Sequence, residues 1–464
     1  MLLEKKLIED LLDAGLSRGA DFAEIFVEET DSTMLQSLSG RLEKANSSKI
    51  RGVGIRLAKK LQTVYGYTNS QNPEDLLKLA KDLSKSFETD TIIKRTPLME
   101  LEVGKRHKAK IKPKDVSLTE KVALMKKAYK AASEYDEAIK QVSVYLIDST
   151  QTVLIANSEG RFVTETRYRE RISISSVAAK EGVMQTGSVG PGSGKGYEYL
   201  FDEIDIEEYA REASKVAVTM LNADECPSGV MPVVIHNGFG GVIFHEACGH
   251  SLEATSVAKN ASVFSGKMGQ KIASDIVTAI DDGTLENRWG SANYDDEGYP
   301  QQRRVLIENG ILKSYMIDKL NGRRMKTEAT GSSRRQNYKF APTSRMSNTF
   351  IDNGKSKFEE IIAATKFGLF AKKLGGGSVN PGNGDFNFSV MEGYMIRNGK
   401  IAEPVRGASL VGNGGKILTK IDMIADNLDS ARGMCGSISG SIPADVGQPT
   451  IRVTEITVGG KGGN

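Results

Sequence analysis

Two of the chain's four histidines lie within six residues, in the segment His245-Glu246-Ala247-Cys248-Gly249-His250. A His-Glu pair followed by a second histidine is how a helix offers two imidazoles to a divalent metal and a carboxylate to a water molecule. In the usual form the histidines are four residues apart. Here they are five apart, which at ~100° per residue turns His250 roughly 140° away from His245. A regular α-helix cannot aim both side chains at one ion.

A locally widened helical turn would remove this conflict. A π-bulge absorbs one extra residue, restores the alignment of the two histidines, and is frequent at functional sites. The small residues Ala247, Cys248 and Gly249 would let the backbone make that adjustment. We therefore predict a π-type turn between residues 245 and 250. A chance occurrence of the pattern on a polar helix face is the alternative.

A catalytic metal site normally takes three protein ligands and leaves one position open. Three residues are candidates for the third ligand: Glu253, Cys248 and Cys435. Glu253 could equally accept a hydrogen bond from a metal-binding imidazole without itself binding the ion. Cys248 would crowd the helical turn that must widen. Cys435 has small neighbours that permit close approach to an ion, but it could also be an inert buried cysteine. The residues alone leave this choice open.

Length, charge and cysteine content limit the class of protein. A chain of 464 residues exceeds a single hydrophobic core, so two or three domains are expected. The 62 Lys and Arg against 59 Asp and Glu give a net charge of +3, which does not favour nucleic acid or an anionic membrane as partner. No apolar run of ~18 residues is present. Three scattered cysteines argue against a disulfide framework, so a cytoplasmic location is expected.

The order helix, strands, helix occurs twice in the first half of the chain, and glycine turns break up the second half. The expected elements are a helix at 1–18, strands over 21–68, a helix at 73–87, then a helix at 117–134, strands over 140–187 and a helix at 205–222. Further on, hairpin signals occur at 308–310, 397–400 and 412–415. We predict an α+β fold in which helix-and-strand N-terminal modules precede a β-rich C-terminal domain with the metal-binding helix. The predicted boundaries are 1–90 for an N-terminal α/β module, 115–222 for a central α/β module and 226–464 for the C-terminal domain.

Several separated motifs agree in order and spacing with one known family. The chain resembles the TldD/PmbA family of metallopeptidases in the segments His245–His250, Met434–Gly440, Gly447–Pro449, Ser344–Phe350 and Gly384–Phe388. The resemblance covers essentially the whole length. PmbA-type paralogues lack the histidine motif, so this chain resembles the active, TldD-type members.

The resemblance implies a zinc-dependent peptidase with one Zn²⁺ per active subunit. It implies His245, His250 and Cys435 as metal ligands, which raises Cys435 above Glu253, and Glu246 as general base. It also implies a peptide substrate and a dimer, of two like chains or with a PmbA-type paralogue. Neither direct nucleic-acid binding nor a membrane is expected.

Substrate contacts are expected from polar, glycine-punctuated strands near 345–351 and 385–390. Such strands could pair with an extended peptide by strand addition, although they could also be ordinary sheet structure. The candidate substrate-binding residues are Arg345, Asn348, Asp385 and Tyr338.

Two non-enzymatic functions compete with hydrolysis of peptide bonds. One is a regulatory or scaffold subunit whose metal is structural or absent. The other is a gyrase-modulator-type protein that acts through a protein partner. An intact Glu246 beside two histidines argues against the first, because a structural metal site has no need of a base. The second predicts association with a protein partner and no chelator-sensitive activity.

Overall fold

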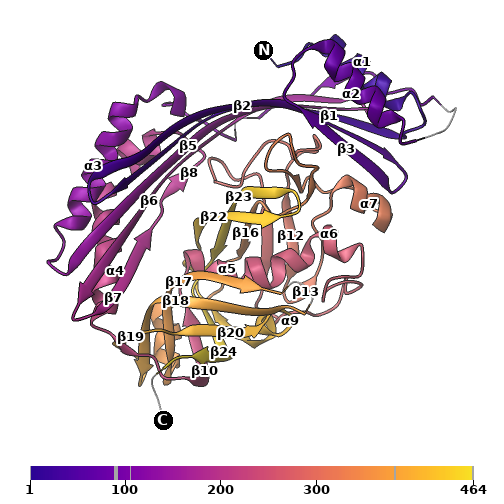
Figure 1. Cartoon of the computed structure of the whole chain (residues 1–464). Coiled ribbons are helices and arrows are strands. Elements are labelled where there is room, and N and C mark those ends of the chain that lie inside the picture. Colours follow the sequence, from indigo (N-terminus) through magenta and orange to yellow (C-terminus); the bar gives the residue numbers. More distant parts are fainter. Residues whose placement is uncertain (1, 88–91, 105, 381–382, 462–464) are drawn as a thin grey trace.

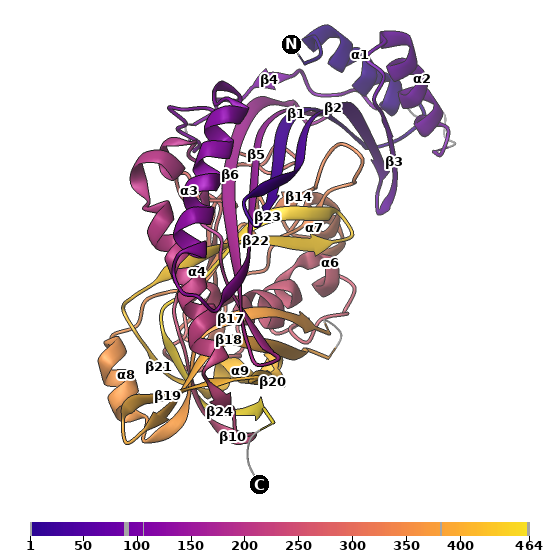
Figure 2. The same cartoon turned by 60° about the vertical axis from the view of Figure 1, so that its left-hand side comes forward.

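The first half of the chain forms one long curved sheet with helices on its outer face (Figures 1 and 2). The computed structural model describes residues 2–87, 92–104, 106–380 and 383–461. The sheet order is β3-β2-β1-β5-β6-β4, and β7 and β8 also pair with β6. Its strands are β1 (Phe22–Leu38), β2 (Arg41–Lys59), β3 (Gln62–Thr68), β4 (Met99–Glu100), β5 (Ile139–Asn157), β6 (Arg161–Lys180), β7 (Val183–Val189) and β8 (Gly192–Ser193).

The predicted pattern of helix, strands and helix is confirmed twice. The helices are α1 (Lys5–Leu16), α2 (Pro73–Ser84), α3 (Leu118–Ser133) and α4 (Ile206–Leu221), with short turns η1 (Pro113–Asp115) and η2 (Tyr199–Glu203). Asn72 accepts a hydrogen bond from the backbone of α2, and Ser117 with Glu120 forms a capping box on α3, so the sequence signals for both helix starts are real caps. Antiparallel pairing of β1 with β5 joins the two repeats into a single sheet.

The second half is a β-rich lobe beneath the curved sheet (Figure 1). Five strands close on themselves in the order β17-β10-β24-β20-β18 and back to β17. The strands of this ring and its attachments are β9 (Asp224–Glu225), β10 (Gly229–Ile235), β17 (Phe367–Val379), β18 (Asp385–Arg397), β19 (Lys400–Arg406), β20 (Ser409–Asn413), β21 (Ile421–Ile424) and β24 (Ile451–Gly459).

A second sheet of the lobe has the order β13-β12-β11-β16-β23-β22. Its strands are β11 (Ala279–Asp282), β12 (Arg303–Glu308), β13 (Ile311–Leu312), β16 (Asn348–Ile351), β22 (Asp429–Ser437) and β23 (Gly440–Gln448), and β14 (Ser333–Arg334) pairs separately with β15 (Thr343–Ser344). The lobe's helical segments are η3 (Gly238–Gly241), α5 (Val242–Phe244), η4 (His245–Gly249), η5 (His250–Leu252), α6 (Ala254–Val257), α7 (Lys319–Met325), α8 (Phe358–Ala364), α9 (Gly414–Ile417) and η6 (Leu418–Lys420). The α+β fold class, with a β-rich C-terminal domain, is confirmed.

Two of the three glycine-turn hairpins form as predicted. Asn309-Gly310 connects β12 to β13, and Asn398-Gly399 connects β18 to β19. The prediction at 412–415 is wrong, because the chain leaves β20 and enters α9, where the side chain of Asn413 accepts a hydrogen bond from the backbone of Gly415. None of the described helices is both long and apolar enough to cross a membrane.

Buried ion pairs join the curved sheet to the lobe. Glu24 of β1 pairs with Arg56 of β2 at 2.6 Å and with Arg335 of the lobe, while Arg56 also pairs with Glu297 of the lobe. All four side chains are at most 5% exposed. Charges so far from water are tolerated only when paired, so at this junction the sheet and the lobe each supply counterions that the other needs.

Candidate metal centre

The helical segment that carries the two histidines is preceded by η3, which packs against the β22–β23 hairpin that carries Cys435. A Cβ added to Gly241 would lie 2.4 Å from the carbonyl oxygen of Gly447 on β23, and one added to Gly240 would lie 2.7 Å from the Gln448 amide. Gly238 has φ +70°, in the left-handed region that favours glycine. These glycines therefore let η3 pack against the β22–β23 hairpin and bring the histidines close to it.

The turn between the histidines is widened, as predicted. Residues His245–Gly249 form a π-helical turn, and the backbone N–H of His250 donates to the carbonyl of His245, five residues earlier. The two imidazole rings consequently face one region, with centroids 5.2 Å apart. The prediction from the five-residue spacing is confirmed.

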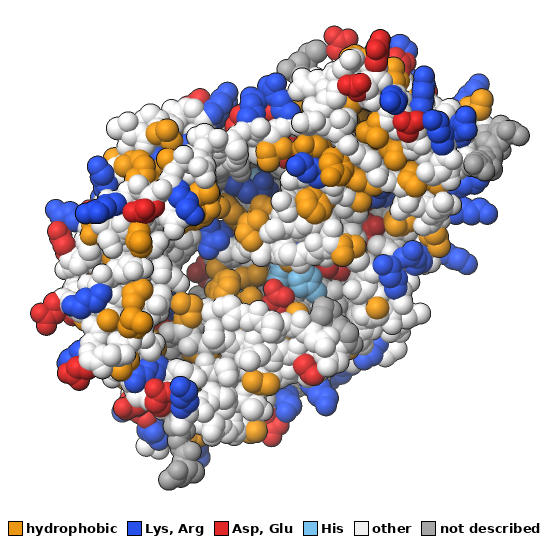
Figure 3. Space-filling view, viewed as in Figure 1, with side chains coloured by type: hydrophobic (Ala, Val, Ile, Leu, Met, Phe, Trp, Pro, Cys, Tyr) orange, Lys and Arg blue, Asp and Glu red, His pale blue; other side chains and the backbone are white. Residues whose placement is uncertain are grey.

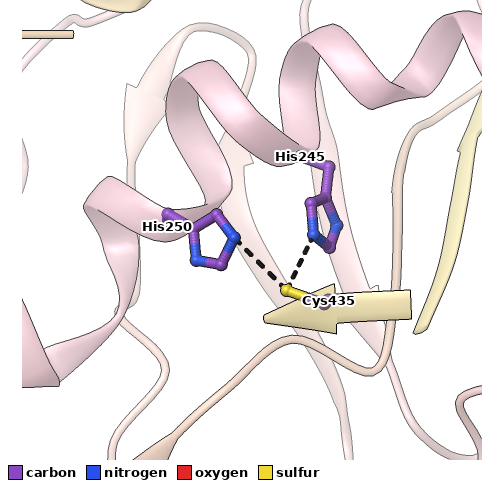
Figure 4. A group of neighbouring side chains, drawn as sticks. All are labelled: His245, His250 and Cys435. Carbon is purple, nitrogen blue, oxygen red and sulfur yellow. Dashed lines mark hydrogen bonds between the residues drawn. The ribbon is translucent and has the colours of Figure 1, made fainter. Parts of the chain in front are cut away.

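Cys435 enters the same region from strand β22 (Figure 4). Its Sγ lies 3.2 Å from Nε2 of His245 and 3.2 Å from Nε2 of His250. The three donor atoms all lie within 4.8 Å of one another. His245 and Cys435 are buried, and His250 keeps a side-chain exposure of 14%.

The protonation of this group is strongly perturbed. Burial opposes ionisation of the Cys435 thiol, but the imidazole of His245 and hydrogen bonds from both histidines outweigh it and lower its pKa to about 3. Burial likewise opposes a charge on His250, yet the carboxylate of Glu253 raises its pKa well above the ordinary value. Ionisation of the Cys435 thiol and protonation of the His250 imidazole are therefore both favoured at this site.

The donor set fits a zinc ion. Bond lengths of ~2.0 Å to nitrogen and ~2.3 Å to sulfur at a tetrahedral angle place such ligands about 3.5 Å apart, close to the separations seen here. Two imidazole nitrogens and a thiolate are ligands that zinc prefers over the oxygen ligands of magnesium or calcium. Among the described residues, the buried Nδ1 atom of His245 has no hydrogen-bond partner, whereas Nδ1 of His250 is held by Glu253.

Glu253 and Arg345 support the group from behind. A Glu253 carboxylate oxygen lies 3.1 Å from Nδ1 of His250 and so fixes the orientation of that ring. Arg345, which is fully buried, donates to the backbone carbonyl of Cys435, and its Nε lies 3.8 Å from Glu253. Arg345 thus contacts both Glu253, which orients His250, and the strand that carries Cys435. The spacing of Glu253 three residues after His250 was the only sequence signal for this arrangement.

Glu246 is the carboxylate at the open side of the group. It follows His245 directly, its carboxylate lies 3.8 Å from Nε2 of His250, and its side chain is 29% exposed. Cys248 lies elsewhere: its side chain is fully buried and its Sγ donates to the carbonyl of Gly414 at 3.3 Å. The structure thus brings Glu246, but not Cys248, to the histidines and Cys435.

The four candidate substrate-binding residues are dispersed. Arg345 is enclosed as described, and Asn348 donates to the carbonyl of Asp282 and the hydroxyl of Ser291 inside the lobe. Tyr338 is buried against the curved sheet, where its backbone N–H donates to Glu28. Asp385 is exposed at the start of β18 and accepts a hydrogen bond from Asn413.

The strands expected to accept a peptide have no free edge. β16 lies between β11 and β23, and β18 lies between β17 on one side and β19 and β20 on the other. The expectation of strand addition at 345–351 and 385–390 is therefore wrong. The free edge nearest the histidines belongs to β22, which pairs with β23 alone among the described strands and carries Cys435.

The π-type turn has little room on its outer side. A Cβ added to Gly414 would lie 2.0 Å from the carbonyl oxygen of Ala247, which is backbone and cannot rotate away. We expect Gly414→Ala to displace the turn and lower the free energy of unfolding by about 1–3 kcal/mol, measured by urea denaturation. Gly376→Ala is the matched control, because a Cβ there meets no atom within 4 Å. Equal stability of the two variants would show that the turn is not tightly held.

Three family models match consecutive parts of the chain. The model described as the PmbA/TldA metallopeptidase domain 1 matches residues 23–87, the central domain matches 111–221 and the C-terminal domain matches 228–460. Curated relatives named as metalloproteases match nearly end to end. A metalloprotease TldD homolog of Haemophilus influenzae is 35% identical over 466 residues, covering 99% of this chain and 97% of its own.

Solved structures share the whole fold at lower identity. A Thermotoga maritima protein titled as a candidate modulator of a DNA gyrase aligns with a TM-score of 0.82 at 21% identity, covering 98% of this chain and 100% of its own. TldE from Thermococcus kodakarensis aligns with a TM-score of 0.78 at 20% identity, covering 97% and 99%. At such identities the likeness establishes the fold alone.

Proposed function

This chain belongs to the TldD/PmbA family of metallopeptidases, and on that premise we propose that it is a zinc-dependent peptidase acting on unstructured peptides or small proteins. The observation that supports this most is the convergence of His245, His250 and Cys435 on one point. An open carboxylate stands beside them. A non-catalytic metal site would need the three donors but not that carboxylate.

A zinc ion, when bound, polarises the scissile carbonyl and makes water a better nucleophile near neutral pH. Glu246 accepts the proton of the attacking water and passes it to the leaving amine. Its partial exposure lets a substrate and a water molecule reach it, while the burial of His245 and Cys435 keeps bulk water away from the donors. Glu253 and Arg345 hold His250 and the Cys435 backbone in place throughout.

We further propose that the substrate binds as an added strand on the free edge of β22. Cys435 lies on that strand, so a peptide paired with it would pass the donor atoms with its backbone amides satisfied. An extended segment can do this whatever its side chains. A folded protein cannot, because its backbone groups are already paired.

For the assembly we propose a dimer, either of two like chains or with a PmbA-type paralogue. A TldE chain shares the fold, which is consistent with pairing between related subunits. Three free cysteines are consistent with a cytoplasmic location.

Chelation tests the proposed function directly. The protein, purified without chelator, is incubated with an unstructured peptide, and the products are identified by mass spectrometry. We expect fragments that disappear with chelator and return when zinc is restored, together with about one zinc per active subunit by elemental analysis. A scaffold or gyrase-modulator subunit would instead bind a protein partner and show no chelator-sensitive cleavage.

Glu253→Gln tests the support behind His250. The amide keeps the size of the side chain but loses the charge that orients the imidazole, so we expect zinc affinity to fall about 10- to 100-fold. Competition with a fluorescent chelator measures this affinity. Glu360→Gln, at a surface helix cap, is the control and should bind zinc as the parent does. Equal affinities in the Glu253 variant and the parent would remove Glu253 from the site.

A further inference from the structure

A cavity of about 610 Å³ opens between the curved sheet and the lobe, and part of its lining comes from η3 and β22, the segments next to the candidate metal centre. Its volume is in the range of ligand pockets. It is lined by β6, β7 and α4 from the sheet side, and by η3, β17 and the first residues of β22 from the lobe. The space-filling view shows a hollow between these two parts, with histidine at its margin and Lys or Arg side chains inside it (Figure 3).

Arg171 and Arg432 line this cavity from the sheet side and the lobe side, and Asp445 is the carboxylate near them. Nε of Arg171 donates to the carbonyl of Gly190 at 3.2 Å, and no carboxylate of the described residues is within ion-pair distance of it. Arg432 donates to the carbonyls of Gly192 and Ser430, and its nearest carboxylate is Asp445 at 3.9 Å. Burial and the neighbouring charge of Arg432 lower the pKa of Arg171.

The two lysines that line the cavity are already paired with carboxylates. Nζ of Lys373 lies 2.9 Å from Glu212, and Nζ of Lys372 lies 2.7 Å from Glu392. The carboxylate of Asp429 accepts a hydrogen bond from the backbone of Ser430. Two guanidinium groups are therefore left with unused donors facing the same space. Guanidinium donors match the two oxygens of a carboxylate.

The cavity lies at a defined distance from the site of cleavage. Arg432 precedes Cys435 by three residues on β22, which is about 10 Å at ~3.3 Å per residue. A peptide that pairs antiparallel with β22 runs from Cys435 toward Arg432. The residues after the scissile bond would thus enter the cavity, and about three of them would span the distance.

We propose that Arg171 and Arg432 form a subsite for the free C-terminal carboxylate of the substrate, so that the enzyme releases short C-terminal fragments. This inference rests on the proposed peptidase function and adds a substrate class to it. A free carboxylate at the chain end is recognised by two guanidinium groups, while the edge of β22 holds the backbone. Long peptides whose C-terminus is blocked lose that contact.

The test uses one unstructured decapeptide without Asp or Glu, made in three forms. The first form has a free C-terminal carboxylate, the second a C-terminal amide, and the third the amide with Asp as the third residue from the end. Initial rates and cleavage positions are measured by mass spectrometry with the zinc-loaded protein. Binding of each form is measured by calorimetry with the Glu246→Gln variant. This measurement does not require cleavage of the peptide.

We expect the free acid to be cleaved about three residues from its end, with kcat/KM about tenfold or more above that of the amide. The double variant Arg171→Gln/Arg432→Gln should remove the preference, so that the acid and the amide are cleaved at equal rates. Arg303→Gln is the matched control, because that arginine is half exposed and is not among the residues that line the cavity. It should keep the full preference.

Three results would overturn the proposal: equal rates and binding for acid and amide, an equal loss for both in the double variant, or preference for the internal Asp over the free terminus. Failure of the peptidase function looks different, because then no form is cleaved by the parent protein. The binding experiment still decides in that case. Tighter binding of the acid that requires both arginines supports the subsite, and equal binding rejects it.

Discussion

Glu246→Gln is expected to abolish peptide hydrolysis while leaving the zinc content unchanged. The amide is nearly the same size as the carboxylate but cannot accept a proton, and loss of a general base typically slows turnover ~10²–10⁴-fold. Because the Glu246 side chain is partly exposed and lies 3.8 Å from His250 without enclosing it, the substitution should not disturb the three donors. Cleavage rates by mass spectrometry and zinc content by elemental analysis measure the two effects separately.

Two outcomes would count against the assignment of Glu246. Hydrolysis at the parent rate would show that another group takes the proton. Loss of zinc along with activity would show that the carboxylate is a ligand and not a base. Glu359→Gln provides a control on the surface helix α8, and both its activity and its zinc content should match those of the parent.

Cys435→Ser is expected to lose most of the bound zinc and, with it, the activity. A neutral hydroxyl is a poor replacement for a thiolate, and the histidines alone cannot hold the ion tightly. His245→Ala and His250→Ala should have the same effect, each leaving two ligands. Zinc content after dialysis and the cleavage rate of the unstructured peptide are the measurements.

Cys248→Ser is the matched control for that substitution. Cys248 is three residues from His245 and fully buried, but its Sγ points to the carbonyl of Gly414. A serine hydroxyl can donate to the same carbonyl, so zinc content and activity should stay close to those of the parent. Equal loss of zinc in the two serine variants would mean that the thiol of Cys435 has no special role.

Features encoded by neighbouring residues could be predicted from the sequence. The caps at Asn72 and Ser117, the turns at Asn309-Gly310 and Asn398-Gly399, and the widened turn after His245 each depend on a few adjacent residues. The five-residue spacing is sufficient for the last of these, because two histidines on a regular helix would diverge.

Features that depend on distant residues could not be predicted in this way. Cys435 is 190 residues from His245, and the sequence alone did not distinguish it from Glu253. Polar residues such as Asn348 and Tyr338 suggested a substrate surface, yet the fold encloses them in hydrogen-bond networks. The sequence of a strand does not show whether both of its edges are paired, because the pairing partners come from segments far along the chain.

The buried ion pairs at the junction have a consequence for how the protein folds. Glu24 belongs to the first strand, and its partner Arg335 is more than 300 residues later, with both side chains at most 1% exposed. Substituting Arg335 alone would leave Glu24 with only Arg56 as its counterion, and breaking a buried pair in this way costs about 3–5 kcal/mol. The first and the third of the sequence segments recognised by family models are thus linked by buried charges.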